Sequence, residues 1–301
     1  MDLRRKRWDL LDIPEGTRGK FAIQHTIQPA GHVESLANGR TAILGGDQLG
    51  TVTFANPTRW HALVEDVGIW MTDRPIEQVQ CDRALRGVRG MVLVGGLGLG
   101  YAATVLALRR SVTRVVVVEK APQVVVLVSP HLARREKAAR AKLEFVTADL
   151  FKYLLKTPMG QFDYGFYDIW ASDGEGTFHE TVVPLRRLSA GKVGRVVCWN
   201  EHIMRGQLRG ALQGRMMSIK LGLERVKGKP CTVDDFCERT GSVWIDWSVP
   251  FFRWVRDAKP APNVAEAGVA AYAKMYEVAP LWESLWDVWR QEFLGGLGRT
   301  R

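Results

Sequence analysis

The sequence predicts an α/β fold built on a doubly wound, mostly parallel sheet, and three observations indicate it. Short β-branched apolar runs alternate with helical stretches between residues 91 and 200. A glycine-rich turn follows the first of these runs, and an acid follows each of the next three. Alternation of this kind predicts parallel strands covered by helices on both faces, with a ligand site at the carboxyl ends of the strands.

A small, mostly antiparallel β-domain is predicted ahead of this sheet, in residues 1–84. Asn38-Gly39 is typical of a two-residue hairpin turn. The strand-like runs of this part cover residues 21–28, 33–36, 41–44, 51–54 and 61–72. Residues 85–301 then form the main domain, with a helical, Trp-rich C-terminal extension that begins at about residue 201.

The glycine unit comes first in the main domain. A strand from Met91 leads to Gly96, Gly98 and Gly100, a helix starts at Tyr101, and the next strand ends on Glu119. Glycines let the backbone approach a ligand because they carry no Cβ. Their spacing fits both the G-x-G-x-x-A pattern of dinucleotide sites and the tighter G-x-G-x-G pattern of S-adenosylmethionine sites, so the glycines do not choose between the two cofactors.

The remaining elements follow the same alternation. Helices are expected at 122–141, 150–155 and 177–188, and strands at 143–146, 162–170 and 192–199. In the extension we expect a helix over 201–223, a strand over 243–247 and a helix whose tryptophans at 282, 286 and 289 pack on a core.

Three acids in register favour a sulfonium cofactor. Glu119, Asp149 and Asp168 each follow the carboxyl end of a predicted strand, where open α/β sheets bind ligands. Glu119 would hold ribose hydroxyls, and Asp149 would accept from an adenine amino group while Leu150 donates its backbone N–H. Asp168 would face the reacting end of the cofactor.

These residues resemble the class I S-adenosylmethionine-dependent methyltransferase fold, which is Rossmann-like, and within it the spermidine synthase-like branch. The likeness covers about residues 60–200 and is carried by residues 63–73, 92–100 and 162–173. It implies that the glycine loop, Glu119 and Asp149 bind the cofactor, that Asp168 is catalytic, and that Asp173 is a second catalytic carboxylate.

The chain also departs from that branch. Leucines, Leu97 and Leu99, stand in the glycine loop where spermidine synthases carry an Asp. Val79-Gln-Cys-Asp82 replaces the expected aromatic and acidic residues, and the two acids of the catalytic loop are five positions apart instead of three. These changes weaken the case for a polyamine substrate and leave the cofactor-binding fold intact.

The leading hypothesis is therefore an S-adenosylmethionine-dependent transferase, and within that class a methyltransferase whose acceptor the sequence does not name. An aminopropyltransferase that uses decarboxylated S-adenosylmethionine is the first alternative, with an acidic pocket around Asp168, Asp173 and Glu175. A nicotinamide-dependent oxidoreductase is disfavoured, because Asp149 and Asp168 would have no evident role in it. A non-catalytic binding or assembly protein of the same fold stays open. Relatives of the branch often dimerise, so a homodimer is one expected state.

The composition argues against a membrane span, a secretory signal and a metal site. The chain has 301 residues, 46% apolar and 25% charged, and no apolar run approaches the roughly 18 residues that a membrane span needs. The basic N-terminus is followed by acids and not by the apolar segment of a secretory signal, so we expect a cytoplasmic protein with no membrane partner. The four cysteines and six histidines show no metal-ligand spacing, so free thiols and no metal are expected.

The net charge of +10 raises the question of a nucleic-acid partner. Residues 85–200 contribute most of it, with 17 basic against 9 acidic side chains. Such residues can bind phosphate backbones, but they more often form solvated helix faces. The sequence shows no stacking aromatics interleaved with them, so a nucleic-acid partner is left open without support.

Overall fold

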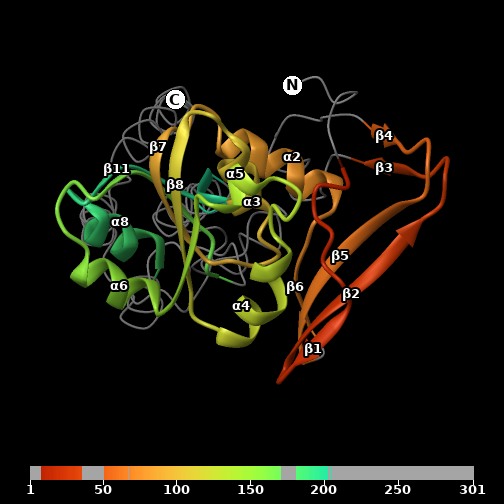
Figure 1. Cartoon of the computed structure of the whole chain (residues 1–301), viewed down its shortest axis with the longest axis horizontal. Coiled ribbons are helices and arrows are strands. Elements are labelled where there is room, and N and C mark those ends of the chain that lie inside the picture. The colour runs from red at the N-terminus through yellow and green to blue at the C-terminus, as the bar shows by residue number, and fades with distance from the viewer. Residues whose placement is uncertain (1–7, 36–50, 67, 171–180, 203, 205–301) are drawn as a thin grey trace, which may run out of the picture. The chain divides into compact units, whose positions relative to one another are not determined.

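The computed structural model describes residues 8–35, 51–66, 68–170, 181–202 and 204 (Figure 1). The chain forms two compact units, one of residues 1–171 and 185–199 and one of residues 172–184 and 200–301. Both units contain residues outside the described ranges, including the predicted Asn38-Gly39 turn, the strand at 41–44 and nearly all of the extension after residue 201. None of the helices in these described ranges has the length and apolar character that a bilayer span requires.

The N-terminal part is antiparallel, as predicted. One sheet has the order β1-β2-β5-β6, and a separate pair joins β3 to β4. Buried Phe21 and Ile23 alternate with more exposed neighbours on β2, which is the period expected of a strand with one buried face. The bounds are β1 Gly16–Arg18, β2 Phe21–Gln28, β3 Val33–Ser35, β4 Thr51–Thr53, β5 Thr58–Glu65 and β6 Gly68–Thr72.

A buried His-Asp pair ties β5 to the end of β6. His61 and Asp73 are both 2% exposed, and Nδ1 of His61 lies 2.7 Å from Oδ2 of Asp73. The other oxygen of Asp73 accepts the backbone N–H of His61 at 2.6 Å. This pair fixes the point at which the chain leaves β6 for helix α2 (Pro75–Ala84).

The main sheet is parallel throughout the described residues, in the order β11-β10-β7-β8-β9. This order confirms the predicted α/β fold with a parallel sheet. Its strands are β7 Gly90–Gly95, β8 Val112–Glu119, β9 Leu143–Thr147, β10 Phe162–Tyr167 and β11 Val193–Cys198. The helices after them are α3 Tyr101–Leu108, α4 Pro122–Val128, α6 Leu150–Lys156 and α8 Val183–Ser189.

Helices cover both faces of this sheet (Figure 1). On β7, Val92 and Val94 join a buried cluster that includes Leu106 of α3. Gly95 points to the opposite face, where a Cβ would lie well inside 3.0 Å of the Leu150 side chain at the start of α6. Successive residues of the strand therefore pack against helices on opposite faces of the sheet, as a doubly wound fold requires.

The predicted helix over 122–141 is not continuous. It divides into α4, a 3₁₀ turn η2 (Ser129–His131) and a short α5 (Lys137–Arg140). Pro130 has no N–H for an α-helical bond, and Ala133 adopts a left-handed φ of +50° that no helix tolerates. The chain therefore turns between α4 and α5.

The predicted strand over 162–170 is shorter than expected. β10 ends at Tyr167, because its neighbour β7 ends at Gly95 and the glycine loop begins there. Asp168 still donates its backbone N–H to the Gly95 carbonyl at 2.8 Å. The last bond of the ladder thus lies at the first residue of the loop after β10.

Candidate functional site

The carboxyl edge of the sheet gathers most of the predicted site. β7 and β10 are adjacent, and connections leave them toward opposite sides of the sheet, so their ends form the topological switch point. Asp168 is held there by its bond to Gly95. One strand further, Ala148 donates its N–H to the Glu119 carbonyl at 2.9 Å, which brings Asp149 to the same edge.

Glu119 connects two loops through both of its carboxylate oxygens. Oε2 accepts the N–H of Leu97 in the glycine loop at 2.8 Å, and Oε1 accepts the N–H of Ala121 at 2.8 Å. Hydrogen bonds to an ionised acceptor are stronger than neutral ones, so this side chain orders the glycine loop. Each oxygen keeps further lone-pair capacity, so the predicted bonds to ribose hydroxyls remain compatible with this arrangement.

Gly96 is required by the protein's own backbone. Its φ is +90°, and a Cβ there would lie well inside 3.0 Å of the Asp168 carbonyl oxygen. A real Cβ essentially never comes that close to another atom. The first glycine of the loop therefore allows β7 and β10 to end side by side. Gly100, with φ +76° and ψ +14°, caps α3.

Met71 covers the middle of the glycine loop. Its sulfur accepts the N–H of Leu99 at 3.2 Å, and a Cβ on Gly98 would lie well inside 3.0 Å of the same sulfur. The space above Gly98 is therefore filled by a side chain from β6, the last strand of the N-terminal sheet. No local pattern signals this contact, because the two residues are 28 positions apart and a Met on a predicted strand is ordinary.

Asp149 caps helix α6. Its Oδ1 accepts the N–H groups of Phe151 at 3.0 Å and Lys152 at 3.2 Å, which are the second and third residues of the helix. Its Oδ2 lies 3.6 Å from the Lys120 ammonium. The capping oxygen serves the helix, and the other oxygen faces a charged surface side chain. Leu150 is buried at the first helical position, which this cap does not serve.

The two predicted catalytic acids differ in what the structure says of them. Asp168 is partly buried at the switch point, directly after β10. Asp173 lies outside the described residues, and so does Glu175. The structure therefore brings Gly96, Gly98, Gly100, Glu119, Asp149, Leu150 and Asp168 to one edge of the sheet, and their roles there stay predictions.

Two further titratable side chains flank the loop. Glu77 accepts the N–H of Thr72, next to Met71, at 3.2 Å, and burial raises the pKa of its carboxyl group from 4.5 to about 7. The Tyr101 hydroxyl donates to Oδ1 of Asp82 at 3.0 Å, and burial, followed by the nearby Asp82 charge, raises the pKa of Tyr101. Neither residue was predicted from the sequence as part of the site.

Comparison with known proteins gives fold likenesses alone. No family model matches the chain, and no curated protein does. Among solved structures, the spermidine synthase of Thermotoga maritima matches with 13% identity and a TM-score of 0.35, over 64% of this chain and 60% of that one. A Methanococcus maripaludis protein described as an S-adenosyl-L-methionine-dependent methyltransferase matches with 13% identity and a TM-score of 0.32, over 56% and 77%. Precorrin-8w decarboxylase of Methanobacterium thermoautotrophicum matches with 19% identity and a TM-score of 0.30, over 40% and 61%.

The resemblance expected from the sequence is thus met by structures of both enzyme groups, as a likeness of fold at low identity. The chain spans about three fifths of the decarboxylase and of the spermidine synthase. TM-scores below 0.5 say nothing about activity. What the chain does has to be inferred from its own side chains.

Proposed function

We propose that this chain is an S-adenosylmethionine-dependent transferase, and within that class a methyltransferase with an acceptor still to be identified. The observation that supports it is the convergence of Glu119, Asp149 and Asp168 with the glycine loop at the switch point of a parallel sheet. Ligands of open α/β sheets bind at such points.

The acids fit the nucleoside half of the cofactor. A ribose diol and an adenine amino group donate hydrogen bonds, and carboxylates accept them. In this proposal Glu119 accepts from the ribose, and Asp149 accepts from the base through the oxygen that does not cap α6. Leu150 donates its N–H to the ring.

A bound sulfonium cofactor supplies an already activated carbon, so the protein's task is orientation. Holding two reacting groups in line can supply roughly 7 to 11 kcal/mol in favourable cases. Asp168 has the position for that task, because its backbone is fixed to Gly95 and its side chain starts at the carboxyl edge. It would orient the acceptor and take its proton.

Titration calorimetry with S-adenosylmethionine tests the proposal. Glu119→Ala should weaken binding tenfold or more, which corresponds to about 1.4 kcal/mol. Asp163→Ala is a matched control, because Asp163 also accepts a backbone N–H, that of Met91 at 2.7 Å, but at the amino end of the same sheet. The control should bind like the wild type. Absence of binding by the wild type at millimolar cofactor would refute the proposal.

A second candidate, aminopropyl transfer, is favoured by one observation. The N–H groups of Leu97 and Leu99 are taken by Glu119 and Met71, so two loop amides are not available to a cofactor carboxylate. A decarboxylated cofactor needs no such donors. Tighter binding of decarboxylated S-adenosylmethionine than of the carboxylated form would select this candidate, and the opposite ranking would select methyl transfer.

A further inference from the structure

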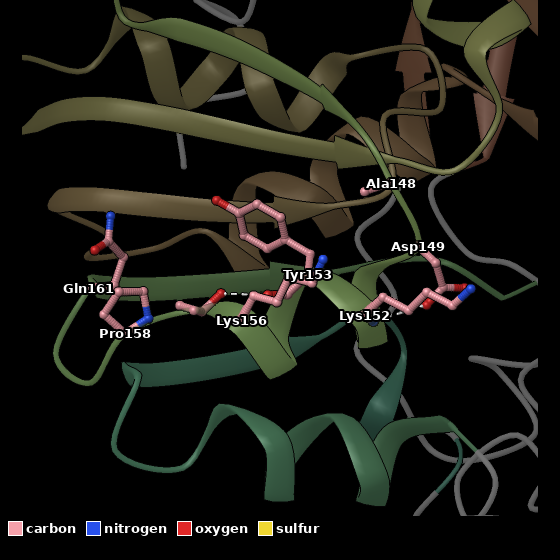
Figure 2. Close-up of a pocket in the computed structure, with 8 residues that line it drawn as sticks. Ala148, Asp149, Lys152, Tyr153, Lys156, Pro158 and Gln161 are labelled. Atoms are coloured by element: carbon pink, nitrogen blue, oxygen red, sulfur yellow. Dashed lines mark hydrogen bonds between the residues drawn. The ribbon is translucent and has the colours of Figure 1, made fainter.

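A groove of about 470 Å³ runs along α6 (Figure 2). We call it the α6 groove. It is lined by two lysines, one tyrosine, an alanine, a proline and three other polar side chains. The lining residues include Asp149 and Gln161, together with Lys152, Tyr153 and Lys156 of α6.

The α6 groove leads away from the candidate cofactor site. Asp149 stands at the carboxyl edge of the sheet, whereas Gln161 directly precedes β10 at the opposite edge. Since α6 returns between β9 and β10, the groove follows the helix from one edge of the sheet to the other. It meets the predicted cofactor residues at Asp149 and is otherwise separate from them.

The charge in the groove favours an anion. Lys152 and Lys156 are exposed and one helical turn apart, which places both ammonium groups on the same side of α6. Neither forms an ion pair with a residue that the structure describes. The acid at the end of the groove, Asp149, is engaged by two backbone N–H groups and stands 3.6 Å from Lys120. Within the described part of the chain, the groove therefore presents two positive charges without a paired carboxylate.

Tyr153 gives the groove a flat apolar surface. Its ring lies in the groove, with the lysines before and after it on the same helix (Figure 2). Burial, followed by the nearby Glu144 charge, raises the pKa of the Tyr153 phenol above its ordinary value. Glu144 itself is paired with Arg114. A neutral aromatic ring beside exposed lysines suits a nucleotide, because the ring can stack a nucleobase while the lysines meet phosphates.

We propose that the α6 groove binds nucleotide phosphates, with a base against Tyr153 and phosphate groups on Lys152 and Lys156. The sequence offered an excess of basic residues without a stacking aromatic, and the fold supplies the aromatic. The net charge of +10 would attract such a ligand from a distance. This inference does not depend on the proposed transferase activity.

Fluorescence anisotropy of the full chain with a labelled oligothymidylate of about 15 nucleotides tests the groove. Lys152→Glu/Lys156→Glu should weaken binding at least tenfold. It should also lower the slope of log K against log salt by roughly 1.4, since each phosphate contact on a single strand contributes about 0.7. Tyr153→Ala should weaken binding, and Tyr153→Phe should restore it because the ring remains.

The matched control changes the net charge equally on the other face of the sheet. Arg134→Glu/Lys137→Glu alters exposed residues at and before α5, whose Ala139 packs in the cluster under α3. It should leave affinity within about twofold of the wild type, the scale of long-range charge effects at physiological salt. Equal losses in both double variants, or no binding by the wild type, would overturn the proposal.

Competition with thymidine monophosphate distinguishes the two sources of the ligand. Much tighter binding of the oligonucleotide assigns the groove to a strand. Equal affinities that both fall in Lys152→Glu/Lys156→Glu assign it to a free nucleotide. If S-adenosylmethionine displaces the oligonucleotide, the α6 groove belongs to the cofactor site and the inference is wrong.

Discussion

Replacing Gly96 by alanine should damage the fold more than replacing Gly98, although both glycines belong to the same loop. The Cβ of Gly96→Ala would collide with the backbone carbonyl of Asp168, which two strand ends hold in place. The Cβ of Gly98→Ala would collide with the sulfur of Met71. A thioether on a flexible side chain can move aside, whereas the end of a parallel ladder cannot.

The magnitudes follow from two costs. A side chain at the +90° φ of Gly96 costs about 1 to 3 kcal/mol, and an overpacked contact with rigid atoms adds about 1 to 3 kcal/mol. We expect a total of about 4 kcal/mol for Gly96→Ala. At the size of this unit that lowers the melting temperature by roughly 8 to 16 °C. For Gly98→Ala, at a φ of +50°, we expect about 1 to 2 kcal/mol.

Thermal unfolding followed by circular dichroism measures both variants without any ligand. Met71→Ala in the Gly98→Ala background removes the collision, so part of the lost stability should return, while Met71→Ala in the Gly96→Ala background should return none. The reasoning would be refuted if Gly96→Ala melted within 2 °C of the wild type, about the scale of 1 kcal/mol or less. A larger loss for Gly98→Ala than for Gly96→Ala would refute it too.

Substitutions at three more residues test a buried carboxyl group, a helix cap and a buried His-Asp pair. Burial raises the pKa of Glu77 from 4.5 to about 7, so the native state keeps a proton that the unfolded chain releases between these values. As the pH rises through this window, the free energy of unfolding of the wild type should fall by about 3 kcal/mol. Urea titrations from pH 5 to 8 should show the difference in unfolding free energy between Glu77→Gln and the wild type changing by about that amount. Asp149→Ala should cost about 1 kcal/mol through the lost cap of α6 while Asp149→Asn costs less, and equal losses in unfolding experiments would contradict the cap. Asp73→Ala should cost about 3 kcal/mol because it leaves the buried His61 without its acceptor, and a loss below 1 kcal/mol would show that the pair is dispensable.

The strands and the edge that carries the acids were predictable because both follow from local patterns. A short β-branched run identifies a buried strand, and a residue directly after it must lie at the carboxyl edge. Glu119, Asp149 and Asp168 were placed by this logic alone. The turn at Pro130 was missed because the apolar run around it continues a helical pattern, although a proline signals a break.

Side-chain partners could not be predicted in the same way. Met71 reaches Leu99 across 28 positions, and nothing in either segment specifies the other. The same holds for the bond from Leu97 to Glu119, which depends on how the two strands align in register. Periodicity determines which face a residue occupies, but the atom that it meets depends on packing from distant segments.

The structure weakens the glycines of the loop as evidence for a bound cofactor. A glycine-rich turn suggests room for a ligand, yet the Cβ positions of Gly96 and Gly98 would collide with Asp168 and Met71 of the protein itself. Gly96 would be needed in this fold with no cofactor at all, and Gly98 faces a side chain of the protein itself. The case for a nucleoside cofactor therefore rests on Glu119 and its neighbouring acids, which accept hydrogen bonds. Because Glu119 also orders the loop, its variants must be judged by cofactor affinity and by ligand-free stability together: Glu119→Ala should lose both, and a loss of stability alone would mean that the carboxylate is a structural brace.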